Sequence, residues 1–147
     1  MSRRQKTVSK IIEIKTFTKE QIEAEVRKAY QRLDAEQKKQ EALEGTYQKT
    51  CAELTRKQTT GTLASHEVDL YTLYLKHINK QTELQKQIVA LRTEEVETLK
   101  TAMVEAYKEQ RLFEILYDKI VREKDKETVK REQKEMDSSF LTRNSKR

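Results

Sequence analysis

Apolar side chains in the first part of the chain recur in alternating steps of four and three residues. From Ile22 the stripe runs without a slip, and its members are Ile22, Val26, Ala29, Leu33, Glu36, Gln40, Leu43, Tyr47, Thr50 and Leu54. This heptad period is typical of a helix that buries one narrow seam against a partner. The pattern predicts a helix over about residues 9–58, in which the polar Glu36 and Gln40 either set the register or serve in docking.

Two readings of the start of this helix are open. Ile11, Ile14 and Phe17 extend the apolar pattern back toward Ser9 and favour one continuous helix. Thr18 and Gln21, in contrast, have the spacing of a capping box, at which the helix would restart. Residues 1–7 are polar and basic, and we expect them to be frayed.

Residues 59–67 are the one place where the helical pattern stops, in a chain with no proline and only two glycines. Gly61 follows the pattern at the point where a left-handed residue is usually needed. Ser65 is suited to cap a new helix, with Glu67 and Asp69 in its first turn. A stop followed at once by a start indicates two antiparallel helices.

The second arm mixes steps of three and four, and its apolar positions are Val68, Tyr71, Tyr74, Leu75, Ile78, Leu84, Ile88, Leu91, Val96, Leu99, Met103, Ala106, Phe113, Leu116, Tyr117 and Ile120. The phase slides between Leu91 and Val96, which predicts a stutter in a helix over about residues 67–140. Folding at the bend pairs Leu54 with Tyr71 and brings Ile14 near Leu112, so residues beyond about 117 outrun the first arm. The predicted fold is all-α: residues 1–147 form a single long antiparallel two-helix coiled-coil hairpin with a longer second helix and basic, frayed tails.

Composition agrees with this class, since 38% of residues are charged and only 35% are hydrophobic. The net charge is +6, but 25 acidic residues are interspersed among 31 basic ones. A mixed surface with no basic stripe weighs against nucleic acid as a partner. The basic excess lies at the two ends, which are either solvated tails or contacts for an acidic partner or a lipid surface.

No enzyme constellation is visible, so we expect a protein that is not an enzyme and has no cofactor and no metal. His66 and His77 lack a metal-binding spacing, and no phosphate-binding glycine loop or serine elbow occurs. The single cysteine, Cys51, fits a reducing compartment. No segment has the pattern of a signal peptide or a membrane span, so we expect a cytoplasmic protein without direct membrane insertion.

The bend end of the hairpin holds more aromatic surface than one seam can bury. Tyr47, Tyr71 and Tyr74 lie there, and tyrosine is favoured where a ring packs while its hydroxyl stays wet, as at interfaces. The three rings either flank the seam or form a docking surface.

Three stretches resemble the FliJ family of flagellar export proteins, which is related to the YscO-like proteins of injectisome type III secretion. They are the start, Ile12-Glu13-Ile14-Lys15 with Phe17; the bend, with aromatics at Tyr71 and Tyr74; and the end. The end, Gln133-Lys134-Glu135-Met136-Asp137-Ser138-Ser139-Phe140, is similar to a Gln-Lys-x-x-Asp-x-x-Phe pattern that closes many members. The resemblance covers essentially the whole chain.

The resemblance implies a central-stalk-like protein that bridges the hexameric export ATPase and the export gate, a membrane protein, and that escorts export chaperones. It would then lie at the cytoplasmic face of the inner membrane through these partners. The gate-facing residues it implies are Gln40, Tyr47, Cys51, Tyr74, Ile78 and Gln81. Two positions that are apolar or aromatic in the family are occupied in this chain by Glu44 and Cys51. The ATPase-facing residues it implies are Gln133, Lys134, Met136, Asp137 and Phe140.

A generic coiled-coil tether or holding chaperone is the competing class, because it needs only solvated helices and no defined tip. A tether would saturate a hexameric ATPase at more than one copy per ring, whereas a stalk would stop at one.

Overall fold

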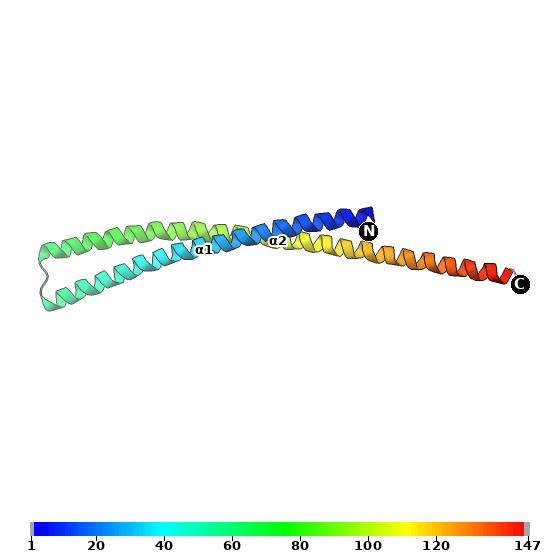
Figure 1. Ribbon diagram of the computed structural model, residues 1–147. Coiled ribbons are helices and arrows are strands. Elements are labelled where there is room, and N and C mark those ends of the chain that lie inside the picture. The colour runs from blue at the N-terminus through cyan, green and yellow to red at the C-terminus, as the bar shows by residue number, and fades with distance from the viewer. Residues whose placement is uncertain (1, 146–147) are drawn as a thin grey trace. The chain divides into compact units, whose positions relative to one another are not determined.

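The chain folds into two helices that pack antiparallel as a helical hairpin, as the heptad pattern predicted. The computed structural model describes residues 2–145, in which α1 spans Arg3–Thr60 and α2 spans Ser65–Ser145 (Figure 1). No strand occurs within this described range, and α2, with 81 residues, is longer than α1, with 58. The predicted fold class is therefore confirmed.

Residue contacts divide the hairpin into two compact units, each built from one stretch of α1 and one of α2. Unit 1 comprises Met1–Ile22 and Met103–Arg147, and unit 2 comprises Glu23–Ala102 with the bend.

The bend of unit 2 closes α1 with a Schellman motif. Gly61 has a φ of 67°, its backbone N–H donates to the Gln58 carbonyl at 3.3 Å, and the Thr62 N–H donates to the Lys57 carbonyl at 3.3 Å. These are the two bonds that define the motif, and they satisfy carbonyls that the last helical turn leaves without partners. The sequence correctly located this stop at Gly61.

The residue that caps α2 is Ala64, one residue before the predicted cap, Ser65. The Ala64 carbonyl accepts from the N–H groups of Glu67 at 3.1 Å and Val68 at 3.3 Å, so Ser65 is already the first helical residue. The expectation that Ser65 caps the helix is thus wrong, although Glu67 does lie in the first turn, where a carboxylate is favourable.

The N-terminal end of α1 is ordered by a capping box rather than frayed. The Gln5 N–H donates to Ser2 Oγ at 3.2 Å, and the Ser2 N–H donates back to Gln5 Oε1 at 2.9 Å. Gln5 and Val8 are buried, so the seam reaches this first turn. The alternative restart at Thr18 does not occur, because α1 runs through it and the Thr18 hydroxyl donates to the Ile14 carbonyl.

The seam of α2 in unit 2 keeps strict three–four spacing, which corrects the predicted stutter. Its buried or half-buried positions are Val68, Tyr71, Leu75, Ile78, Thr82, Gln85, Val89, Arg92, Val96 and Leu99. Leu84, Ile88 and Leu91 are exposed instead. The chain therefore buries a more polar stripe and leaves an apolar one open to solvent.

Unit 1 pairs the first turns of α1 with α2 up to about Val121. Lys15 Nζ lies 2.7 Å from Glu109 Oε2, and Gln110 Nε2 donates to Thr16 Oγ1 at 2.8 Å. Val8, Ala106 and Ile120 are buried. Every residue of α2 from 122 to 145 is exposed. Lys124 Nζ still donates to Gln5 Oε1 of α1 at 3.4 Å, and residues 125–145 lie beyond this contact with α1.

Candidate functional site

Unit 2 presents the residues that the sequence assigned to a gate partner, but not all on one surface. Tyr47 and Cys51 of α1 are half-buried, as is Gln40, whose side-chain amide donates to Glu44 Oε1 at 3.1 Å. The remaining three gate-facing residues belong to α2. Tyr74 and Gln81 are exposed, whereas Ile78 is buried in the seam. Ile78 therefore packs beneath this surface and exposes little side-chain area to a partner.

The bend end also holds a lysine–tyrosine contact across the seam. Lys57 Nζ lies 5.2 Å from the ring centroid of Tyr71, within cation–π range. Hydrogen bonding to Tyr71 raises the pKa of Lys57 above its ordinary value. Tyr71 is thus engaged across the seam, Tyr47 is half-buried like it, and Tyr74 is the most exposed of the three.

A polar layer crosses the seam in the middle of unit 2. Gln85 Nε2 of α2 donates to the Glu36 carboxylate at 2.6 Å and to the Glu36 backbone carbonyl at 2.9 Å. The hydrogen bond from Gln85 holds the pKa of Glu36 below its ordinary value, against the opposing effect of burial. Glu36 is thus a seam residue, as the sequence predicted, and its bonds single out one register of the two helices.

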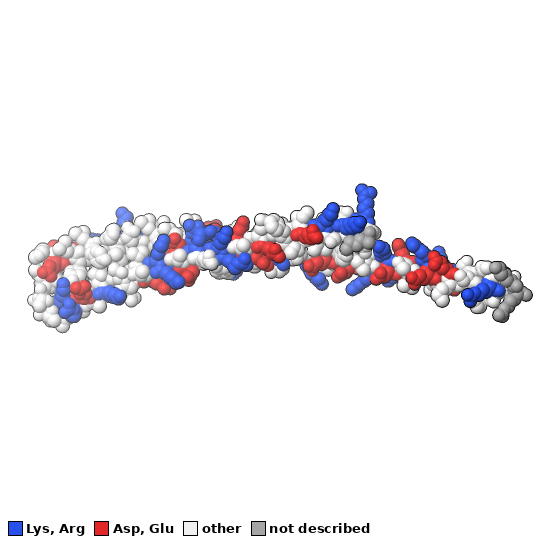
Figure 2. All heavy atoms as spheres, in the orientation of Figure 1, with Lys and Arg blue, Asp and Glu red and all other residues white. Residues whose placement is uncertain are grey.

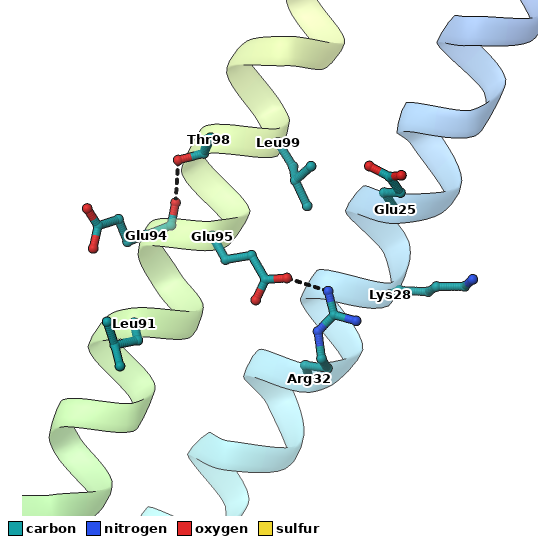
Figure 3. Close-up of a pocket in the computed structure, with 8 residues that line it drawn as sticks. All are labelled: Glu25, Lys28, Arg32, Leu91, Glu94, Glu95, Thr98 and Leu99. Atoms are coloured by element: carbon teal, nitrogen blue, oxygen red, sulfur yellow. Dashed lines mark hydrogen bonds and ion pairs between the residues drawn. The ribbon is translucent and has the colours of Figure 1, made fainter.

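An ion-pair cluster beside this layer fixes the register a second time. Glu95 of α2 accepts from Arg92 at 3.1 Å and also pairs with Arg32 of α1. Both guanidinium groups, Arg92 first, hold the pKa of Glu95 below its ordinary value. Figure 3 shows Glu95 reaching across to Arg32 in a shallow groove between the helices, which is lined by Glu25, Lys28, Arg32, Leu91, Glu94, Glu95, Thr98 and Leu99.

The end of α2, in unit 1, carries the residues assigned to an ATPase partner, and all five are exposed. They lie along two different grooves of the helix surface. Gln133, Lys134 and Asp137 line one, and Met136 and Phe140 line the other. The first groove is lined by polar and charged side chains alone, whereas the second adds two apolar side chains to polar ones.

Basic and acidic side chains alternate over most of the visible surface. Figure 2 shows basic and acidic side chains interspersed along it, with the most extensive uncharged area over the helix ends near the bend. No group of histidine, cysteine and carboxylate side chains within residues 2–145 is placed to hold a metal ion. In that same range neither helix has a stretch long and apolar enough to cross a membrane.

Sequence reasoning missed the exposed apolar side chains Leu84, Ile88 and Leu91, which it assigned to the seam. The signal that identifies them is the unbroken heptad from Val68 through Thr82 and Gln85 to Val96, which hydrophobicity alone does not reveal because its middle members are polar.

The fold and these surfaces define a class: a helical hairpin scaffold whose chemistry lies in exposed helix faces rather than in an enclosed pocket. Within that class the family is shown by a family model described as "Flagellar FliJ protein", which matches residues 5–147. The chain belongs to the FliJ family and is a component of flagellar export. Neither the search of curated proteins nor the search of solved structures found a match to this chain.

Proposed function

We propose that this chain is a non-enzymatic, central-stalk-like part of the flagellar export apparatus that bridges the hexameric export ATPase and the export gate. One observation carries the proposal: a FliJ-family hairpin in which α2 continues, wholly exposed, from residue 122 to 145. A charged helix with scattered apolar residues and no packing partner has little to stabilise it alone. Enclosure by a ring of subunits supplies that stabilisation.

The ATPase contact is assigned to Met136 and Phe140, with Gln133, Lys134 and Asp137 on the adjacent face. Each is exposed, so a partner reaches it without unfolding the hairpin. Because the two adjacent faces differ in their side chains, ring subunits that contact them meet different surfaces. Catalysis stays in the ATPase, and the chain acts by biasing its subunits through unequal contacts.

The gate contact is assigned to the bend end of unit 2, through Tyr47, Cys51, Tyr74 and Gln81, with Gln40 at its edge and Ile78 beneath. The half-exposed tyrosines supply ring area with little loss of side-chain entropy. Export chaperones are assigned to the remaining exposed helix faces. Through these partners the chain would lie at the cytoplasmic face of the inner membrane.

Removal of residues 132–147 tests the ATPase contact. We expect the truncated chain to lose stimulation of ATP hydrolysis by the purified hexameric ATPase, while circular dichroism retains the helices of the paired region. The sharper variant is Met136→Ser with Phe140→Ser, and its matched control is Val129→Ser on the same exposed stretch. Full stimulation by the truncated chain, or saturation above one chain per ring, would contradict the stalk role.

The double variant Tyr47→Ala with Tyr74→Ala tests the gate contact. It should keep the helical circular dichroism of the parent chain and lose pull-down of the cytoplasmic part of the gate protein. Leu91→Ala is the control, because Leu91 is exposed in the same unit but lies outside the assigned surface. Retained binding by the double variant would refute the assignment.

A further inference from the structure

Unit 1 carries an apolar surface to which both helices contribute and which lies outside the gate-facing and ATPase-facing residues. Ile14 and Phe17 of α1 are 63% and 60% exposed, and Leu112 and Ile115 of α2 are 64% and 51% exposed. The half-buried Ile11 and Leu116 complete what is called here the unit 1 apolar surface.

The register of unit 1 places Ile11, Ile14, Leu112 and Leu116 on the same side of the helix pair, and Phe17 and Ile115 lie at the outer margins of this surface. The contacts of Lys15 with Glu109 and of Thr16 with Gln110 set Ile14 opposite Leu112 and Ile11 opposite Leu116. Ile11 and Leu116 each come directly before a seam position, Ile12 and Tyr117. In an antiparallel pair such positions face each other along one edge of the seam, as the ion-paired Arg32 and Glu95 do in unit 2.

The border of this surface is rich in basic side chains. Lys10 of α1 and Lys108, Lys119 and Arg122 of α2 border it, and the two carboxylates on the same edge are already in ion pairs, Glu105 with Lys108 and Glu109 with Lys15. Lys119 and Arg122 also line a groove around Ile115, together with Arg111 and Asp118. Lys108 is paired with Glu105 at 3.5 Å, whereas Lys10, Lys119 and Arg122 form no salt bridge within the described residues.

We propose that the unit 1 apolar surface binds an amphipathic helix of a partner protein whose apolar stripe is flanked by aspartate and glutamate. Two parallel rows of apolar side chains cradle a third helix as the helices of a coiled coil do, with apolar side chains at three–four spacing inserted between them. Acidic flanks of that helix face Lys10, Lys119 and Arg122, which gives the docking both attraction and orientation.

The same basic border disfavours two other occupants. A second copy of this chain would bring Lys10, Lys119 and Arg122 against the same residues of its partner, and like charges across an interface are costly. An anionic bilayer would meet Glu105 and Asp118, which lie among the basic residues on α2. A partner helix, in contrast, can place its acidic side chains opposite the basic residues and away from these two carboxylates.

The test uses the full chain and two labelled synthetic peptides three heptads long, each with leucine on one stripe. One peptide has glutamate on the flanks and the other has lysine, and binding is followed by fluorescence anisotropy. We expect the glutamate peptide to bind to the parent chain. The double variant Ile14→Ser with Leu112→Ser should lower the affinity for this peptide by about tenfold or more. The control, Leu70→Ser with Leu73→Ser, removes two side chains of the same exposure from unit 2 and should leave binding unchanged.

A charge exchange completes the test. The double variant Lys119→Glu with Arg122→Glu should weaken binding of the glutamate peptide and strengthen binding of the lysine peptide. Lys126→Glu with Lys130→Glu, farther along the exposed end of α2, should change the binding of neither peptide. Equal binding of the two peptides by the parent chain overturns the proposal. So does a dimer, seen by sedimentation equilibrium, that Ile14→Ser with Leu112→Ser abolishes. Binding to phosphatidylglycerol vesicles that needs this surface, without binding of the glutamate peptide, assigns it to lipid instead.

The outcome is separable from the proposed function. None of the substituted residues lies among the gate-facing or ATPase-facing sets, so failure of peptide binding leaves those contacts untouched. Conversely, loss of ATPase stimulation on truncation says nothing about the unit 1 apolar surface.

Discussion

Two stretches of α2, residues 65–102 in unit 2 and residues 122–145 in unit 1, have opposite relations to solvent. In unit 2, α2 has a partner helix, and its seam is closed by apolar contacts, by the Glu36–Gln85 bonds and by the Arg32–Glu95 pair. In unit 1, residues 122–145 are helical with every side chain exposed. The same charged, proline-free composition thus serves two purposes. Where the seam is occupied, this composition gives a defined register, and where the seam is open, it leaves the whole helix surface exposed to solvent.

The largest expected effect comes from placing a carboxylate in each part. Val96 is 2% exposed and Val129 is 60% exposed. Val96→Asp buries an unpaired charge and should destabilise the hairpin by at least about 3 kcal/mol. Val129→Asp should change stability by no more than about 0.5 kcal/mol. Thermal and urea unfolding followed by circular dichroism measure both, and a similar loss in the two variants would show that residues around 129 are packed in solution.

The two glycines differ in what they require: Gly61 has a left-handed backbone conformation, whereas Gly45 lies in a helix with free space around it. Gly61→Ala forces a side chain into the left-handed region and should cost about 1–2 kcal/mol. Gly45 is helical, and a β-carbon built there meets nothing within 4 Å, so Gly45→Ala should stabilise the helix by about 0.5–1 kcal/mol. Equilibrium urea unfolding compares them. Stabilisation by Gly61→Ala would mean that the hairpin reverses by a different turn.

The smallest expected effect is a pH dependence that belongs to the polar layer of unit 2. Because the folded-state pKa of Glu36 is lowered, its contribution to stability is present above the pKa of a glutamate in the unfolded chain, about 4.3, and is lost as pH falls through the lower folded value. Glu36→Gln keeps an acceptor for Gln85 but cannot titrate. Its melting temperature should therefore fall less steeply than that of the parent chain below about pH 4.

The exposed Glu41 supplies the control for that experiment, since Glu41→Gln changes the same chemical group on the same helix. If the two variants show the same acid profile, the hydrogen bond between Gln85 and Glu36 contributes nothing measurable to folding.

Much of the architecture was predictable because it depends on local signals. The uninterrupted heptad of α1, the stop at Gly61 and the scarcity of helix breakers need no knowledge of the folded chain. The candidate site was less predictable from the sequence. The buried position of Ile78 and the division of Met136 and Phe140 from Lys134 and Asp137 follow from the helix register and surface, and no sequence motif displays them.

By itself the sequence determined that two amphipathic helices would form and where they would reverse, since helix propensity and the left-handed glycine act within a few residues. Only the tertiary structure decided which stripe of α2 is buried. The row Leu84, Ile88 and Leu91 is the more apolar, yet the row Thr82, Gln85 and Val89 faces α1. The reason is that all residues of a helix turn together, so the register fixed by Val96, Ile78 and the Gln85–Glu36 bonds carries the intervening polar residues into the seam.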